Sequence, residues 1–199
     1  MGDEAVGEEA VVESSEVAYR PSPGWPKVVG ILSVVFGGIA ILFTVGGLAL
    51  LPFFGGMVKG QLNGATLPPS MQLSPLAIGL SAYGALVNLL LIIAGFMTLA
   101  RKASGRTMHL VYAMLGVVST FLGLFYQFQM AGAVKAWAAN YPDNAMVQQM
   151  ASQSGGPSLM IGLVITLVLG LAWPVFNIIW FGMVKRDPES MIGTDDEFV

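Results

Sequence analysis

The chain has 199 residues, of which 55% are hydrophobic and 11% are charged, and its formal net charge is −3. A typical soluble domain carries about 25% charged residues, so this composition excludes an ordinary water-exposed surface. The chain contains no cysteine, which excludes disulfides and thiolate metal sites.

The first 27 residues predict an acidic, proline-rich and disordered tail. Six of the twelve acidic residues lie within the first 16 positions. A segment with dense like charge and few apolar residues cannot bury enough surface to fold. Three prolines, at positions 21, 23 and 26, then separate this tail from an apolar run. Because a secretory signal peptide begins with basic residues, we expect no cleaved signal here.

Four segments without Asp, Glu, Lys or Arg follow the tail. They are residues 28–51, 76–100, 107–130 and 159–184. A helix needs roughly 20 mostly apolar residues to cross the hydrocarbon of a bilayer. The sequence therefore predicts an all-α polytopic membrane protein, a four-transmembrane-helix bundle over residues 28–184.

The segments between the spans differ in character. Residues 52–75 contain four prolines and four glycines, which predicts an outer loop with a short interfacial part. Residues 131–158 form the other outer segment, where apolar spacing extends the third span to about Pro142. Asp143 or Asn144 is then expected to cap a short helix that ends near Gln153.

Basic residues at the span ends predict the orientation. Three of the nine Lys and Arg residues lie between positions 101 and 106. Because Lys and Arg accumulate on the cytoplasmic side, we expect this turn and both termini to be cytoplasmic, including a second acidic tail at 185–199. The residues assigned as topology anchors are Lys27, Arg101, Lys102, Arg106, Lys185 and Arg186.

Small and polar residues recur at helical spacing in each span. Lipid tails are as apolar as leucine, so membrane helices associate through close packing and interhelical hydrogen bonds. We therefore expect a compact left-handed bundle, with the two intramembrane asparagines as structural groups and solute contact as the alternative. The residues assigned to this role are Ser33, Gly37, Asn88, Gly116, Thr120, Gly123, Gly162, Thr166, Gly170 and Asn177. Pro174 is expected to kink its helix and to free the carbonyl of Gly170.

No constellation in the sequence indicates catalysis. His109 is the only histidine, and we expect it to lie at the cytoplasmic interface. The spans hold no carboxylate, which argues against a proton- or sodium-coupled carrier. We expect a protein that is not an enzyme and has no catalytic residues, no cofactor and no metal site.

Two stretches, PKVVGILSVVFGGIAIL (26–42) and LARKASGRTMHLVYAMLGVVS (99–119), resemble small bacterial four-span membrane proteins without an assigned activity. In those proteins a glycine-rich first helix follows a short proline segment, and the second helix ends in a basic Gly-Arg hairpin. The resemblance implies a bacterial inner membrane and a four-helix bundle. Claudin-like and tetraspanin-like proteins rely on outer cysteines, which this chain lacks.

Two functional hypotheses follow. The first is a scaffold, assembly or regulatory protein that acts through partner proteins or lipids. The alternative is an oligomeric channel or carrier for a neutral or lipid-like solute, with Asn88, Thr120, Thr166 and Asn177 lining its path. The expected partners are the bilayer, other membrane proteins and further copies of this chain, and no nucleic acid.

Overall fold

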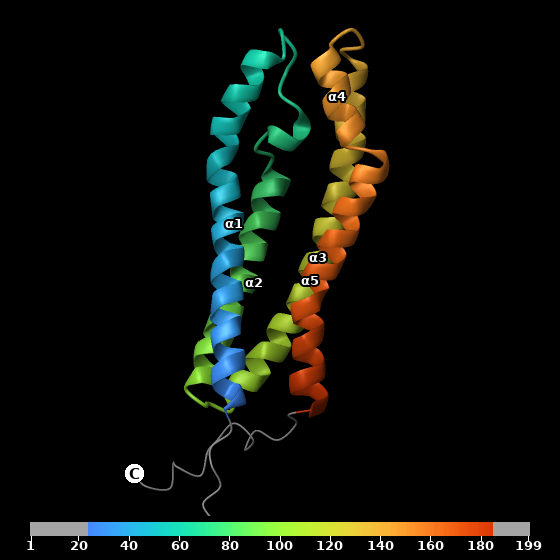
Figure 1. The fold of residues 1–199 in the computed structure, drawn as a ribbon. Helices are drawn as coiled ribbons and strands as arrows, with labels where there is room; N and C mark the ends of the chain where they lie inside the picture. Colours follow the sequence, from blue (N-terminus) through green and yellow to red (C-terminus); the bar gives the residue numbers. More distant parts are fainter. Residues whose placement is uncertain (1–23, 185–199) are drawn as a thin grey trace, which may run out of the picture.

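A computed structural model describes residues 24–184 (Figure 1). Most of the N-terminal tail, the C-terminal tail and the anchors Lys185 and Arg186 lie outside the described residues. Within them the chain is all-helical and holds no strand. The elements are α1 (Trp25–Gln61), η1 (Pro69–Met71), α2 (Pro75–Leu99), α3 (Ser104–Ala139), α4 (Ala145–Gln153), α5 (Gly156–Ile179) and the π-helical turn η2 (Trp180–Val184).

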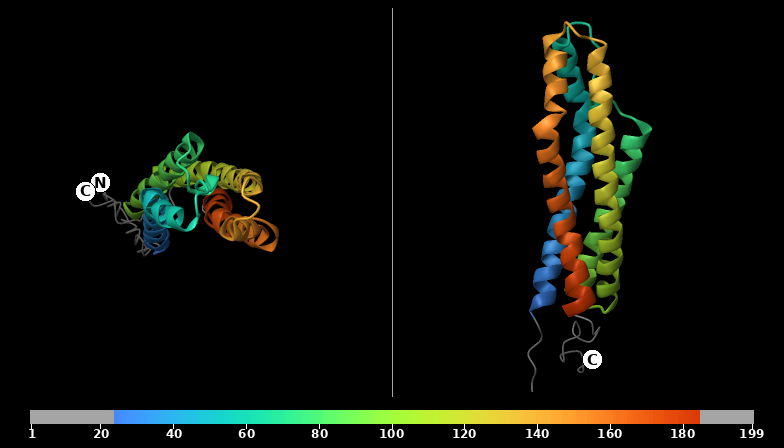
Figure 2. Two further views of the ribbon diagram at one scale, coloured as in Figure 1. Left: turned by 90° about the horizontal axis from the view of Figure 1, so that it is seen from above. Right: turned by 90° about the vertical axis from the view of Figure 1, so that its right-hand side faces the viewer.

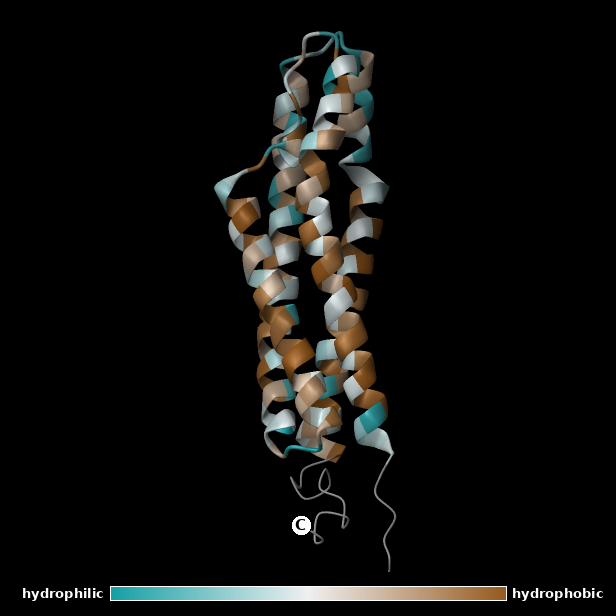
Figure 3. Cartoon of the chain, turned by 90° about the vertical axis from the view of Figure 1, so that its left-hand side faces the viewer, coloured by the Kyte–Doolittle hydropathy of each residue, from teal (hydrophilic) through white to brown (hydrophobic). Residues whose placement is uncertain are grey.

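Four helices are long and apolar enough to cross a membrane, and the helical architecture confirms the all-α class. They contain 37, 25, 36 and 29 residues, the last being α5 with η2. Large apolar side chains point outward from them, such as Leu42 and Phe43, which are 73% and 79% exposed. Figure 3 shows hydrophobic residues along the middle of the helices and hydrophilic ones gathered toward the two ends. This distribution is the one that a bilayer stabilises.

One helix continues beyond the end predicted from the sequence. Residues 52–61, predicted as part of a loop, extend α1 through Pro52. Helix α3 runs to Ala139, close to the predicted end near Pro142. At about 1.5 Å per residue, α1 is about 55 Å long, whereas the hydrocarbon of a bilayer is about 30 Å thick. The prediction of a loop from residue 52 is therefore wrong. A small core lies beyond the end of α1, where Leu62 and Ala65 pack against side chains of α3 and α4.

This core lies in what we call the head, the end of the molecule formed by residues 52–74 and 131–155. Leu62 and Val147 are fully buried there, with Val134 and Trp137 around them. A hydrogen bond joins α3 to the segment that follows α1 in the head: the indole Nε1 of Trp137 donates to the Thr66 carbonyl (3.1 Å).

Asn144 has two roles in the head. Its side chain accepts a hydrogen bond from the Val147 amide (3.2 Å), so it caps α4 at the position where the sequence allowed Asp143 or Asn144. Its Nδ2 donates to the Leu62 carbonyl (2.8 Å). The same residue therefore starts α4 and joins it to the end of α1.

Glycines allow α1 and α2 to approach closely. A Cβ atom on Gly30 would lie 2.9 Å from the Gly95 carbonyl oxygen, and one on Gly37 would lie 2.9 Å from the Asn88 carbonyl oxygen. Ser33 lies between these contacts, is fully buried and donates to the carbonyl of Val29. This contact depends on the absence of side chains at the two α1 glycines.

The long helices form an open arc, not a closed bundle. Seen from above in Figure 2, α1 packs on α2, α2 on α3 and α3 on α5. Contacts of α1 with α5 and η2 are sparse and include edge-to-face aromatic pairs. The ring centroids of Phe36 and Trp173 are 4.9 Å apart, and those of Trp25 and Trp180 are 5.9 Å apart. The expectation of a compact bundle thus holds along three interfaces and fails at the fourth.

Candidate functional site

A groove of about 810 Å³ lies where α1 and α5 diverge, and we call it the central groove. Its volume falls within the range of roughly 300–1,000 Å³ that is common for small-molecule sites. The groove is open on the side between α1 and α5, because the lining residues Ile39 and Leu169 are 46% and 71% exposed. Its walls also include Phe36, Asn88, Leu91, Thr120, Thr166 and Trp173.

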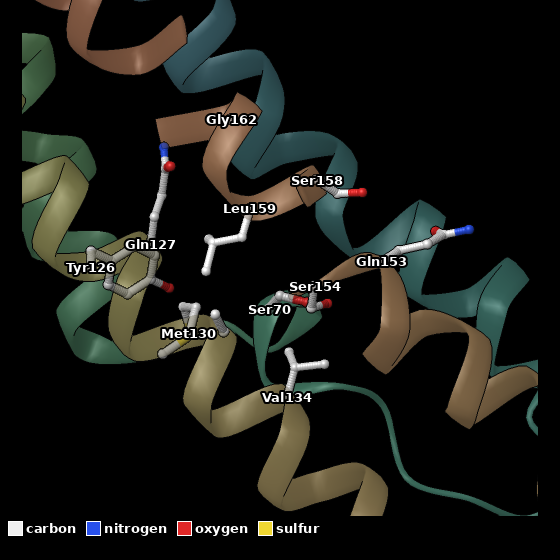
Figure 4. Close-up of a pocket in the computed structure, with 11 residues that line it drawn as sticks. Ser70, Tyr126, Gln127, Met130, Val134, Gln153, Ser154, Ser158, Leu159 and Gly162 are labelled. Carbon is white, nitrogen blue, oxygen red and sulfur yellow. The ribbon is translucent and has the colours of Figure 1, made fainter. Parts of the chain in front are cut away.

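Two further spaces adjoin the central groove toward the head. A middle cavity of about 410 Å³ lies between α1, α2 and α3, and an outer pocket of about 340 Å³ lies between α3 and the start of α5 (Figure 4). Ser119 and Gly123 line both the central groove and the middle cavity. Ser70 and Tyr126 line both the middle cavity and the outer pocket. The three spaces therefore form one row, which we call the cleft.

One face of α3 runs along the whole cleft. Ser119, Gly123 and Tyr126 follow the i, i+4, i+7 spacing that places residues on one side of a helix. In Figure 4 the Leu159 side chain points from α5 into the outer pocket, whereas Gln153 points away from it. The outer pocket is thus walled by α3 on one side and by the first turn of α5 on the other.

The polar groups of the cleft are uncharged. Its lining contains hydroxyls and amides, and no Asp, Glu, Lys, Arg or His. The side-chain Nδ2 of Asn88 donates to the Gly84 carbonyl of its own helix (2.8 Å). Among the described residues, the hydroxyls of Ser119 and Tyr126 have no hydrogen-bond partner. A cleft of this composition suits a ligand that is mostly apolar and carries neutral polar groups.

Pro174 and Thr120 connect α5 to α3. Proline at position 174 has no N–H to donate to the Gly170 carbonyl, as the sequence predicts. The Thr120 hydroxyl lies 3.0 Å from that carbonyl and also 3.0 Å from the carbonyl of Gly116 in its own helix. A Cβ on Gly116 would lie 3.0 Å from the Pro174 ring. The helices therefore meet closely where the proline interrupts the hydrogen bonding of α5.

A second polar contact crosses from α3 to α5 nearer the head. Gln127 Nε2 donates to Thr166 Oγ1 over 2.9 Å. Gln127 lines the outer pocket and Thr166 lines the central groove. The pair therefore joins a residue of the outer pocket on α3 to a residue of the central groove on α5.

The residues predicted to pack in the membrane divide into two sets. Those at helix contacts are Ser33, Gly37, Gly116, Thr120, Thr166 and Gly170. Gly116, Thr120, Thr166 and Gly170 also line the central groove. A Cβ added to Gly123 or Gly162 would meet no heavy atom within 4 Å, so these two glycines line the cleft without forming a close contact. Glycine spacing alone could not separate the two sets, because a missing side chain serves a close contact and an open space equally.

The two intramembrane asparagines lie in different places. Asn88 lines the central groove. Asn177 is fully buried near the C-terminal end of α5, and its Nδ2 donates to the Trp173 carbonyl (2.7 Å). Each amide group thus bonds within its own helix. Asn177 is not part of the cleft, although the alternative channel or carrier hypothesis placed both asparagines on one path.

The end opposite the head, which we call the basic end, holds a buried histidine. Lys27, Arg101, Lys102 and Arg106 all lie at this end, at the start of α1 and around the α2–α3 turn. His109 is fully buried there among the helices, and its position at the level of the membrane interface stays a prediction.

Contacts from three elements bury the imidazole of His109. Its Nε2 lies 3.1 Å from Thr98 Oγ1, and its ring stacks on Phe181 with centroids 4.5 Å apart. Asn177 is near enough to interact with the ring, but His109 Nδ1 and Asn177 Oδ1 make no hydrogen bond of good geometry. Arg106 Nε donates to the Phe181 carbonyl (2.9 Å), which holds η2 over the imidazole. The sequence offered no signal for this cluster, because α5 returns to it only after 75 residues.

The fold defines a helical protein with four helices long and apolar enough to cross a membrane, and an uncharged cleft opens between two of them. Within residues 24–184, no group of three or more His, Cys, Asp or Glu side chains is placed to hold a metal ion. No protein-family model, curated protein or solved structure matches the chain. The cleft is the candidate site on its geometry alone.

Proposed function

We propose that this is a non-enzymatic integral membrane protein that binds a lipid-like molecule in the cleft, as a carrier or as a lipid-responsive regulator. The supporting observation is the central groove, which is open between α1 and α5 among residues suited to face lipid. A molecule dissolved in the bilayer can therefore enter sideways without crossing water.

The chemistry of the lining supports this class of ligand. Charged groups inside a membrane are costly, by about 2.5–3.5 kcal/mol on insertion scales, unless they find a partner. The cleft offers apolar walls and neutral hydroxyl and amide groups. An ion would find no opposite charge there, whereas an acyl chain finds apolar contact along the whole groove.

Native mass spectrometry of the full chain, purified in a mild detergent, tests the proposal. We expect a lipid to remain bound. The variant Gly123→Leu places a side chain in the cleft where a Cβ meets no other atom, and it should reduce bound lipid about tenfold or more. Gly38→Leu is the matched control, because Gly38 is equally unobstructed but does not line the cleft. Equal lipid retention by both variants would contradict binding in the cleft.

We also propose that the basic end faces the cytoplasm of a bacterial cell, in its inner membrane. Four basic residues at this end support the orientation, against Lys59 and Lys135 in the head. Because the chain has no cysteine, single cysteines can report the side. In intact cells, an impermeant thiol reagent should label Asp143→Cys in the head and leave Ser104→Cys unlabelled until the cells are opened. The reverse labelling pattern would show that the head, and not the basic end, faces the cytoplasm.

The scaffold role predicted from the sequence remains a second proposal. No feature of residues 24–184 is specific to a protein partner, so the cleft makes lipid binding the better supported function. Crosslinking of the full chain in native membranes, followed by identification of the products, tests the scaffold role. Recovery of uncrosslinked monomer alone would leave it without support.

A further inference from the structure

We infer that the molecule in the cleft is a lipid with an uncharged, hydroxyl-bearing head group, whose head lies in the outer pocket and whose acyl chain extends into the central groove. This inference rests on the proposed function and adds the chemical class and the direction of the ligand.

The direction follows from the two ends of the cleft. At the end nearer the basic end of the molecule, the rings of Phe36 and Trp173 meet across the central groove, 4.9 Å apart. At the other end, the outer pocket is lined by Tyr126, Gln127 and Ser154, among others. An apolar chain is therefore best accommodated toward the aromatic pair, and a polar head toward the outer pocket.

Unpaired polar groups mark where the head and its linkage would bind. The hydroxyls of Tyr126 and Ser119 make no hydrogen bond within residues 24–184, although both line the cleft. Gln127 uses its Nε2 for Thr166, while its side-chain oxygen has no donor in the same range. Polar groups without partners in an apolar environment gain free energy from a ligand that bonds to them. Hydroxyl groups on the ligand can both donate to the amide oxygen and accept from the phenol.

The charges of the site favour a neutral head. No lining residue of the cleft is ionisable apart from tyrosine. Lys135 belongs to α3, is exposed and does not line the cleft. Its side chain reaches the α4–α5 turn, where its Nζ lies 3.3 Å from the position that a Cβ on Gly155 would occupy. A phosphate inside the outer pocket would have no lining cation to pair with, so the uncharged head is preferred.

A matched pair of probes tests this preference. One is a monoacylglycerol with a brominated acyl chain, and the other is the same molecule with a phosphate on its glycerol. Bromine quenches nearby tryptophan fluorescence, and Trp173 lines the central groove. Quenching is measured in phosphatidylcholine nanodiscs for the unchanged full chain and for Trp173→Phe, so that the difference reports the groove. A native mass spectrometry titration of the unchanged chain gives the same affinities without any substitution.

We expect the monoacylglycerol to quench Trp173 beyond the level set by its bulk fraction, with an affinity at least about tenfold higher than that of the phosphorylated probe. Tyr126→Phe removes only one hydroxyl. It should lower the affinity for the monoacylglycerol by about two- to tenfold, as expected for the loss of one neutral hydrogen bond. An unchanged affinity in Tyr126→Phe would overturn the placement of the head.

The remaining outcomes separate this inference from the proposed function. Equal binding of both probes would overturn the neutral-head preference and leave lipid binding in place. Tighter binding of the phosphorylated probe, lost in Lys135→Gln, would place an anionic head at the rim and overturn the inference. Quenching by neither probe beyond the bulk level would overturn both the inference and lipid binding in the cleft.

Discussion

Thr120 compensates for the hydrogen bond that Pro174 removes from α5. Its hydroxyl reaches the Gly170 carbonyl across the helix interface (3.0 Å). In a membrane an unpaired carbonyl is unfavourable, because no water is present to bond to it. A side chain from the neighbouring helix therefore both pairs this carbonyl and joins α3 to α5.

The double substitution of these two residues tests that role. Thr120→Val keeps the shape of the side chain and removes the hydroxyl, and it should destabilise the protein by about 0.6–2 kcal/mol. In a Pro174→Ala background, position 174 regains an N–H for Gly170, so the same substitution should have a smaller effect. Unfolding in mixed detergent micelles gives the four free energies of the cycle. An equal loss in both backgrounds would show that Thr120 acts by other contacts.

Gly37 and Gly38 provide a matched pair of neighbouring glycines. A Cβ on Gly37 meets the Asn88 carbonyl oxygen at 2.9 Å, whereas one on Gly38 meets nothing within 4 Å. Both gain the same helix propensity when changed to alanine. Gly37→Ala should lower the free energy of unfolding by about 1–3 kcal/mol through overpacking, and Gly38→Ala should be neutral or slightly stabilising. Thermal denaturation in detergent compares them, and similar melting temperatures would argue against close packing of α1 on α2.

At the scale of elements, the head is where helices continue after the apolar spans end. Its hydrogen bonds join segments far apart in sequence, such as Thr66 with Trp137 and Tyr141. The Thr66 side chain and then its backbone amide bond to the Tyr141 phenol, and together they lower the pKa of this tyrosine from its ordinary value of 10.0. The loop after α1 is thus tied to the end of α3.

This pKa shift predicts how the head responds to alkali. Because the native head holds the Tyr141 proton less tightly than the unfolded chain does, the shift adds stability above the ordinary tyrosine pKa, and this contribution is lost as the pH falls through the native pKa. Thr66→Val should raise the pKa of Tyr141 toward 10.0. Phenolate absorbance, with Tyr141→Phe as the reference, measures it. An unchanged titration in Thr66→Val would mean that the hydroxyl does not contribute.

At the scale of the whole molecule, exposed side chains lie in two environments. Leu42 and Phe125 are 73% and 60% exposed along the middle of α1 and α3. Lys59 and Ala136 are exposed on the extensions of the same two helices in the head. All four side chains are exposed on the surface of the protein when no bilayer is considered. A bilayer of about 30 Å distinguishes them, because it covers only the middle of the longer helices.

Single cysteines should therefore separate into two groups in membrane vesicles. Lys59→Cys and Ala136→Cys should react readily with a water-soluble maleimide, and Leu42→Cys and Phe125→Cys should react at least about tenfold more slowly. Denaturation in detergent provides the control, since all four should then react alike. Fast labelling at position 42 or 125 in intact vesicles would contradict the membrane placement.

The sequence predicted those features that depend on local composition. An apolar run without charge forms a helix in hydrocarbon whatever its neighbours are, so the four long helices follow directly from the segments. The cap at Asn144 and the interrupted hydrogen bonding before Pro174 are equally local. Several glycines at close contacts were also predicted. Their separation from Gly123 and Gly162 was not, because the spacing of a residue does not reveal what faces it.

Hydropathy and charge act residue by residue, so the helical class, the four apolar segments and the basic residues at one end were all predictable before folding was considered. Folding was needed to show three further features: α1 and α5 diverge, Phe181 packs on the buried His109, and uncharged groups of α3 line the row of spaces that forms the cleft. These features arise from contacts between helices that are distant in the chain. Their geometry depends on how side chains of several elements fit together, which no single segment encodes.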